Sequence, residues 1–340
     1  MQGGENVRTV HGKTSYRIAV LAALGAAAVC SVLLGTAVGS VPLTLREILR
    51  ALWVDDDSTA RLLVWHLRFP RVLTGGLVGV CLSLSGCLLQ SVMRNRLASP
   101  STVGVSSGAA FVGYLTLVAM PAYAHLLPLG AVLGAFATTM LIYALAWRRG
   151  VSPVRMILSG LAVSALFGAC NDIIRTAFSE SLGNASGFLV GGLNGATWET
   201  LLTVLPWAVV GAVACLLLPT KMNILTLGDE TANTLGLRTE RFRFLLIAVS
   251  SLLAGAAISA AGLIGFVGLI VPHIARLLVG ADHKYLLPAS ALLGFVLVTA
   301  CDTLGRILLS PGEIPVSIIL SLIGAPFFLW LLRSRDEGGV

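Results

Sequence analysis

The stretch Phe69–Val92, FPRVLTGGLVGVCLSLSGCLLQSV, decides the fold class, because its 24 residues carry one charged side chain, Arg71. An α-helix needs about 20 apolar residues to cross a bilayer core of about 30 Å. The whole chain shares this bias: of 340 residues, 56% are hydrophobic and 11% are charged. A water-soluble domain carries roughly 25% charged residues. The sequence therefore predicts an all-α membrane protein.

Similar apolar windows recur along the chain and predict about ten transmembrane helices. They form a single membrane domain over 17–333, between an N-terminal tail, 1–16, and a C-terminal tail, 334–340. The first window has no small-residue cleavage site, so it is predicted to be a retained helix rather than a signal peptide. The predicted spans are 17–38, 69–92, 104–120, 124–146, 154–177, 198–218, 242–260, 263–279, 285–308 and 314–332.

The basic residues predict the orientation of these helices. With a cytoplasmic N-terminus, 16 of the 23 Lys and Arg residues fall in inner segments and seven in outer ones. Such an excess is typical of the cytoplasmic side of a membrane protein. It explains the net charge of +7 without nucleic acid as a partner, because the basic residues stand in short clusters between apolar spans. Both termini are expected in the cytoplasm.

Two connections are longer than turns. In the first, 39–68, Thr44 and Glu47 have the spacing of a capping box, and Leu45, Ile48 and Leu52 share an apolar face with Leu49. This pattern predicts a short amphipathic helix at the outer surface. The second connection, 219–241, is predicted to be cytoplasmic.

Small residues recur at every fourth position in three spans, a pattern that lets neighbouring helix backbones approach closely in lipid. The six cysteines all lie in apolar runs with no C-x-x-C pair, so they are interpreted as packing residues and no metal site is predicted. The three stripes are Gly75, Gly79, Ser83, Cys87 and Ser91; Gly160, Ser164 and Gly168; and Ser251, Gly255 and Ser259.

Several motifs follow one another in a fixed order. The ordered set is specific to one known family, whereas any one of these motifs alone is not. They are LRFPRVL at 67–73, RNRLASP at 94–100, GVSSGA at 104–109, LGDETANTLG at 227–236, GFVGLIVPHIAR at 265–276, GADH at 280–283, EIPV at 313–316 and GAPF at 324–327.

Together these motifs resemble the FecCD family, the permeases of importers for ferric siderophores, haem and cobalamin. The resemblance covers about 15–333. Two positions depart from the family pattern: Arg96 replaces the proline of Asn-Pro-Leu-Ala, and Ser317 stands where a glycine is frequent. The family implies the type II ABC importer architecture in a bacterial cytoplasmic (inner) membrane.

The resemblance also implies partners. Two permeases, either a homodimer or a pair of paralogues, would surround a central pathway, with two cytoplasmic ABC ATPases below and one substrate-binding protein above. ATP and Mg²⁺ would bind the ATPases. This subunit would therefore bind no cofactor and carry no catalytic residue. An iron–siderophore complex is the first candidate cargo, followed by haem and cobalamin.

The connection 219–241 matches the family's ATPase-coupling segment. Two short helices separated by a turn at Gly236 are expected, with acidic residues favoured at a helix N-terminus. Leu225, Leu227, Ala232 and Leu235 are expected to fill a groove on the ATPase, although a helix resting on lipid would explain the same pattern. The predicted coupling residues are Leu227, Gly228, Asp229, Glu230, Ala232, Leu235 and Gly236.

Arg68 and Arg71 match the family's paired outer arginines, and Arg306 is a candidate third. They are predicted to dock acidic residues of the binding protein, which would also steer its approach. Cations anchored at the membrane edge are the alternative interpretation. Asp302 precedes Arg306 by four residues, the spacing of a helical ion pair.

Asn171, Asp172 and Arg175 lie near the outer end of the fifth predicted span, either at the mouth of the pathway or as a local ion pair. Val151 and Ser152, at the inner end of the same span, are gate candidates, although a helix N-cap would also explain Ser152.

Two other classes of protein remain as alternatives. An ion-coupled secondary transporter would show repeated halves with broken or charged helices near the membrane centre, and the sequence shows no clear inverted repeat. A membrane-embedded enzyme would need a catalytic cluster such as His-Glu-x-x-His, which does not occur. The sequence therefore favours a translocation subunit over both.

Overall fold

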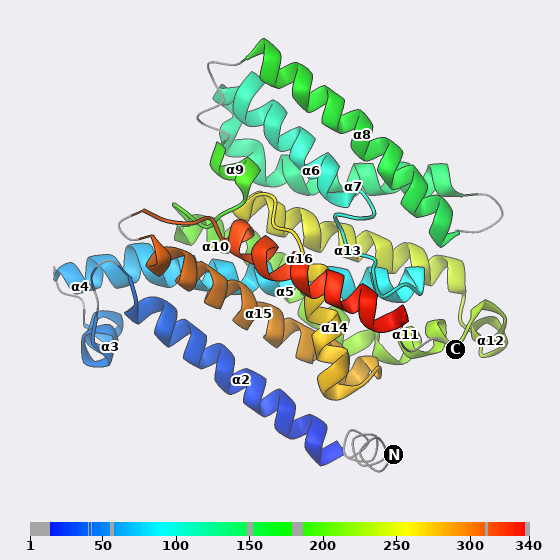
Figure 1. Ribbon diagram of the computed structural model, residues 1–340, viewed down its shortest axis with the longest axis horizontal. Coiled ribbons are helices and arrows are strands. Elements are labelled where there is room, and N and C mark those ends of the chain that lie inside the picture. The colour runs from blue at the N-terminus through cyan, green and yellow to red at the C-terminus, as the bar shows by residue number, and fades with distance from the viewer. Residues whose placement is uncertain are drawn as a thin grey trace.

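The structure, a computed structural model, describes residues 14–39, 41, 43–54, 58–147, 152–178, 186–309 and 312–336. These residues form a bundle of long helices with short helices at its ends (Figure 1). Within these described ranges, seven helices are long and apolar enough to cross a membrane. Three shorter apolar helices match the other predicted spans: Val105–Ala119, Val267–Val279 and Val316–Leu331. The predicted all-α membrane fold is confirmed.

The elements follow one another along the chain as helices of very different length. They are α2 (Thr14–Ala37), α3 (Leu45–Trp53), α4 (Thr59–Arg61), η1 (Leu62–Arg68), α5 (Phe69–Met93), α6 (Val105–Tyr114), η2 (Leu115–Ala119), η3 (Pro121–Leu126), α7 (Leu127–Ala146), α8 (Pro153–Ala177), α9 (Ser186–Val190), α10 (Trp198–Leu217), α11 (Pro219–Thr226), α12 (Asp229–Thr234), α13 (Thr239–Ala261), α14 (Val267–Val279), α15 (His283–Leu308) and α16 (Val316–Asp336).

Helix α5 forms the centre of the bundle. Nearly all of its residues are buried, and it contacts α15, α13, α10 and α14. The helical path begins ten residues before the predicted span, at Thr59, and passes through the π-helical turns of η1 before reaching Phe69. Such wider turns inside a helix often occur at functional sites.

The small-residue stripes explain how closely the helices pack. A Cβ added at Gly79 would lie 2.1 Å from the carbonyl oxygen of Gly294 on α15, and one at Gly86 would lie 1.9 Å from that of Gly268 on α14. Only glycine permits these two crossings. The predicted stripe on α5 is therefore a contact surface, whereas Gly168 on α8 faces open space.

The helices lie in a clear order across the bundle. Helices α6, α7 and α8 pack on one another along one side, α13 joins them to α5, and α2 packs against α15 on the opposite side (Figure 1). The outward face of α8 is consequently uncovered in the single chain.

The predicted span at 263–279 is only partly helical. Helix α14 begins at Val267, and its 13 residues cover about 20 Å at 1.5 Å per residue. Before it, Gly262 and Phe266 have positive φ angles of 67° and 66°. The Leu263 N–H donates to the carbonyl oxygen of Phe188, and the Gly192 N–H donates to that of Ala261, so the backbone around this segment is joined to α9 and the loop after it. Non-helical backbone is tolerated at membrane depth where protein covers it.

The bundle has two ends that carry different short elements. We call the end that holds α3, the C-terminus of α2 and the start of α5 the α3 end. The opposite end, which holds α11 and α12, is the α12 end (Figure 1). At the α3 end the predicted capping box is confirmed: the hydroxyl of Thr44 accepts from Glu47 N–H, and the Glu47 carboxylate accepts from Thr44 N–H at 2.7 Å.

Candidate functional site

At the α3 end, Arg68 caps the C-terminus of α2. Its guanidinium donates to the carbonyl oxygens of Thr36 at 3.0 Å, Ala37 at 3.1 Å and Val41 at 2.5 Å. The last carbonyls of a helix have no partner within the helix, and a cation is favoured there. Only 6% of Arg68 is exposed. Arg68 therefore holds the first helix against the start of α5.

Arg306 performs the same task from α15. It donates to the carbonyl oxygens of Gly35 at 2.7 Å and Val38 at 3.2 Å, and it is 7% exposed. Its Nε lies 3.4 Å from Oδ2 of Asp302, so the predicted i, i+4 ion pair is confirmed. Two arginines from separate helices thus secure the end of α2.

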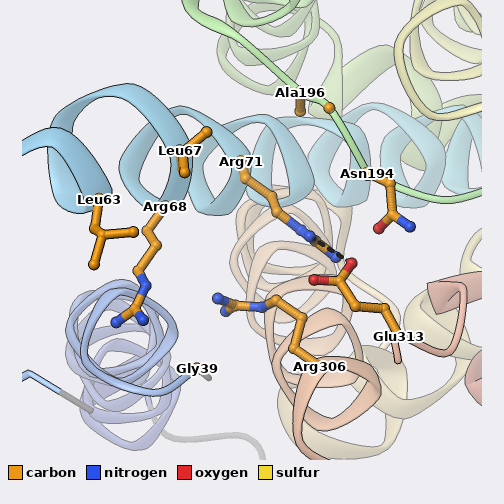
Figure 2. A pocket seen from close by; sticks show the side chains of 10 residues that line it. Gly39, Leu63, Leu67, Arg68, Arg71, Asn194, Ala196, Arg306 and Glu313 are labelled. Carbon is orange, nitrogen blue, oxygen red and sulfur yellow. Dashed lines mark hydrogen bonds and ion pairs between the residues drawn. The ribbon is translucent and has the colours of Figure 1, made fainter. Parts of the chain in front are cut away.

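Arg71 completes the cluster by joining three elements. Its guanidinium makes a two-pronged contact with the carboxylate of Asp302 at 2.9 and 3.0 Å and a further bond to Glu313 at 2.9 Å. Paired contacts of this kind fix both partners in position. Figure 2 shows Arg71 and Glu313 pointing toward each other while Arg68 points toward α2.

The three arginines line a cavity of about 360 Å³ at the α3 end. Each of them is engaged within the chain, so none extends freely into the surroundings. Their docking role stays a prediction, and any partner would meet them at the mouth of this cavity. The remaining lining residues are Gly39, Leu63, Leu67, Asn194, Gly195, Ala196 and Glu313.

At the α12 end, the predicted coupling segment forms two short helices, but the turn between them is not where the sequence placed it. Helices α11 and α12 are separated at Leu227 and Gly228, which has a φ of 116°, whereas Gly236, with a φ of 81°, ends α12. The Leu237 N–H donates to the carbonyl of Ala232, as expected where a left-handed glycine terminates a helix. The motif contains two glycines, and the sequence analysis assigned the separating turn to Gly236 rather than to Gly228.

The predicted groove-filling residues divide into two pairs. Leu225 and Ala232 are completely buried within the chain, so the prediction that they fill a groove on a partner is wrong. Leu227 and Leu235 are 61% and 58% exposed. A single chain thus exposes one leucine before α12, Leu227, and one after it, Leu235. The other two residues are buried and pack α11 and α12 against the rest of the chain.

Asp229 and Glu230 lie in the first turn of α12, as predicted. Asp229 accepts from Arg243 of α13 at 2.6 Å and also pairs with Arg94, which follows α5. Two arginines from the long helices therefore attach the coupling segment to the bundle. The sequence offered no signal for these partners, because 135 residues separate Arg94 from Asp229.

A second polar connection attaches α11. The side chain of Asn223 accepts from both the backbone N–H and Nδ1 of His283 and donates to Asp282 at 2.8 Å. The Nε2 of His283 lies 2.8 Å from Oγ of Ser91 on α5. The coupling segment is thereby linked to α15 and α5. The sequence indicated Ser91 only as a packing residue and His283 only as part of the GADH motif, and it gave no sign of their connection to Asn223.

Helix α8 carries most of the remaining predicted residues. Asp172 and Arg175 form an i, i+3 ion pair at 3.7 Å, and the Asp172 side chain is 75% exposed. Asn171 is partly buried nearby, and Ser152 occupies the N-cap position of α8 without a side-chain capping bond. Val151 lies outside the described residues.

Metal-ligating side chains do not gather in the part of the chain that the structure describes: it contains no group of three or more His, Cys, Asp and Glu residues. His273 instead packs edge-on against Phe327 with ring centroids 6.0 Å apart. The sites that remain are therefore the α3-end cavity, the coupling segment and the exposed face of α8.

These features define a multi-span, all-α membrane transport subunit. The profile of the FecCD transport family matches residues 26–334. The chain belongs to this family. Its fold also matches a solved metal-chelate type ABC transporter in an inward-facing conformation, at a TM-score of 0.82 and 32% identity over 93% of this chain and 99% of that one. The predicted type II ABC importer permease architecture is confirmed.

Three relatives illustrate the range of the family. The chain is 44% identical to the cobalamin import system permease BtuC of Halobacterium salinarum, over 82% of this chain and 75% of the relative. It is 38% identical to the Fe(3+)-citrate import system permease YfmD of Bacillus subtilis, over 88% and 90%. It is 39% identical to the hemin transport system permease HmuU of Yersinia pestis, over 85% and 89%.

Proposed function

We propose that the chain is the membrane-spanning permease subunit of an ATP-driven importer for a metal chelate, with an iron–siderophore complex as the first candidate cargo and haem or cobalamin as alternatives. One observation carries the proposal: Leu227 and Leu235 stand exposed beside a helix that Asp229 secures to the bundle. The relatives are named as permeases of import or transport systems for Fe(3+)-citrate, hemin and cobalamin, and these names support the cargo class.

Two ATPase subunits would take up these exposed leucines. Buried apolar anchors give most of the binding energy at protein interfaces. A push on α12 would pass to α13 through Arg243 and toward α5 through Arg94. ATP hydrolysis, with its Mg²⁺, would take place on the ATPases alone, so this subunit would be a non-enzymatic translocation subunit with no bound cofactor.

The orientation follows from this assignment. The α12 end and both termini would face the cytoplasm of a bacterium, and the chain would lie in its inner membrane. The positive-inside pattern supports this orientation, because 16 of 23 basic residues then lie inside.

The exposed face of α8 supports a second permease, identical or paralogous, on the other side of a central pathway. Leu158, Leu161 and Ile173 are exposed on this helix together with Asp172 and Arg175. Charged side chains within a membrane face a partner or a water-filled cavity rather than lipid. Asn171, Asp172 and Arg175 would then lie at the mouth of the pathway, and Val151 and Ser152 near its inner gate.

At the α3 end, one substrate-binding protein would meet the cavity mouth of both permeases. Each cavity region holds Arg68, Arg71 and Arg306 against two carboxylates, Asp302 and Glu313, which leaves one positive charge in excess. An acidic surface on the binding protein would be attracted to it.

Reconstitution with the ATPase and the binding protein tests the proposal. The cargo is the chelate that raises ATP turnover and accumulates inside vesicles. Leu235→Glu should abolish import and weaken co-purification of the ATPase. Val54→Glu, which places the same charge on an exposed apolar position at the opposite end, should retain ATPase binding. Accumulation of the chelate without any ATPase would indicate an ion-coupled transporter and contradict the proposal.

A further inference from the structure

We infer that a cavity of about 250 Å³ at the α12 end, lined by Arg94, Arg96 and Arg276, binds a phosphate-bearing anion. The cavity lies where the end of α5, the end of α14, the end of α11 and the start of α15 meet. It stands apart from the arginine cluster of the α3 end. Its volume far exceeds the 10–15 Å³ that one water molecule requires, so a hydrated phosphate group fits.

The charge of the cavity is one-sided. Three arginines line it, and no carboxylate is among its lining residues. Arg94 pairs with Asp229, but Asp229 is already shared with Arg243. Neither Arg96 nor Arg276 forms an ion pair with a carboxylate among the residues that the structure describes. Two guanidinium charges thus line one cavity without a counter-charge from the described part of the chain.

Arg276 has an unfilled hydrogen-bonding position. One terminal nitrogen donates to Oε1 of Gln90 at 3.1 Å, which is a neutral partner. The other terminal nitrogen is buried and has no hydrogen-bond partner among the residues that the structure describes. A buried donor without an acceptor is unfavourable, particularly when it carries charge. An anion in the cavity would supply a counter-charge to this guanidinium.

The rest of the lining suits a phosphate group. Guanidinium groups bind phosphate oxygens through paired N–H donors and keep their charge at every physiological pH. The side-chain amides of Gln90 and Asn95 carry N–H donors for further oxygens, whereas the other polar lining residues hydrogen-bond within the chain. These are Ser91, Thr226 and His283.

The position of the cavity connects it to the coupling segment. Arg94 belongs both to the cavity and to the ion pair with Asp229 at the start of α12. Thr226, at the end of α11, also lines the cavity. A bound anion would share Arg94 with Asp229 and would therefore act on the attachment of α12 to the bundle.

Two sources can supply the phosphate, a phosphate-bearing lipid headgroup and a free phosphate ion, and two binding measurements distinguish them. Neither measurement requires the ATPase or a cargo, so failure of the proposed function leaves this inference standing. In the first, radiolabelled inorganic phosphate is titrated into the protein in uncharged detergent. In the second, native mass spectrometry records phosphatidylglycerol retained by the protein, with phosphatidylcholine as the comparison lipid.

Three variants make the test specific. Arg96→Gln removes an exposed cavity arginine, and Arg276→Gln removes the one with the unfilled donor. Arg241→Gln removes an exposed arginine at the same end that does not line the cavity, and it serves as the control. If Arg276→Gln fails to fold, Arg96→Gln alone decides the result.

Each cavity variant should lower the affinity about tenfold, equivalent to about 1.4 kcal/mol, and the control should stay within about twofold. Loss of phosphate binding in the cavity variants identifies a free anion as the ligand. Loss of phosphatidylglycerol retention, with no competition by phosphate, identifies a lipid. The inference is overturned if wild type binds neither probe or if Arg241→Gln reduces binding as much as Arg96→Gln does.

Discussion

Replacing Arg68 with methionine distinguishes between capping and docking roles at the α3 end. The substitution keeps much of the aliphatic bulk but removes three hydrogen bonds to the carbonyls of Thr36, Ala37 and Val41. A hydrogen bond to a charged group contributes about 1.5–3 kcal/mol net. The buried guanidinium also costs free energy because it is removed from water, and the substitution eliminates this cost, which offsets part of the loss. We therefore expect the free energy of unfolding to fall by about 3 kcal/mol.

The assay is unfolding by SDS in mixed micelles, followed by tryptophan fluorescence. Arg46→Met is the matched control, since Arg46 is exposed on α3 at the same end, and a surface substitution of this kind changes stability by less than about 0.5 kcal/mol. The capping role is refuted if Arg68→Met is as stable as Arg46→Met. Loss of binding-protein docking in that stable variant would instead make Arg68 a docking residue.

The remaining predictions concern packing, a helix cap and the α11 attachment. Gly86→Ala should lower stability by about 1–3 kcal/mol, because its Cβ would meet the Gly268 carbonyl, whereas Gly168→Ala, in open space, should be neutral or stabilising in the same unfolding assay. Hydrogen bonds from the backbone N–H and the hydroxyl of Thr44 lower the pKa of Glu47. Helix α3 should therefore be protected above the unfolded pKa and lose protection as the pH falls through the lower folded value. Hydrogen exchange should show this loss, and Thr44→Ala, which removes the hydroxyl but keeps the backbone donor, should reduce it. Asn223→Ala should cost about 1–3 kcal/mol, measured by SDS unfolding, and no change would show that the contact with His283 is dispensable.

The number and order of the spanning helices could be predicted from the sequence, because burial in lipid depends on the composition of each window alone. The capping box at Thr44 and the Asp302–Arg306 pair could also be predicted, since both depend on spacing within one helix. Contacts between distant helices have no such local signal. Nothing near Arg68 in the sequence indicates that its partners are the final carbonyls of α2.

Local conformation also limited the prediction. The segment before α14 is as apolar as a helix, but the positive φ angles of Gly262 and Phe266 interrupt the helical path. Its Leu263 N–H donates to the carbonyl oxygen of Phe188, which lies in α9. Composition predicts that such a segment is buried in the membrane domain, whereas its shape depends on neighbours that only the folded chain brings together.

Helix α5 relates the two ends of the molecule. At its start, Arg68 and Arg71 find carbonyls and carboxylates within the chain, so that end is fixed electrostatically before any partner arrives. After its end, Arg94 finds one shared carboxylate and Arg96 none among the described residues. Helix α5 is buried along almost its whole length. It can therefore act as a rigid connection between an end whose arginines are paired within the chain and an end where arginine charge is not balanced by the described residues. Unmatched charge at the α12 end is therefore where a ligand has most to gain by binding, and where its binding would most directly reach the coupling segment.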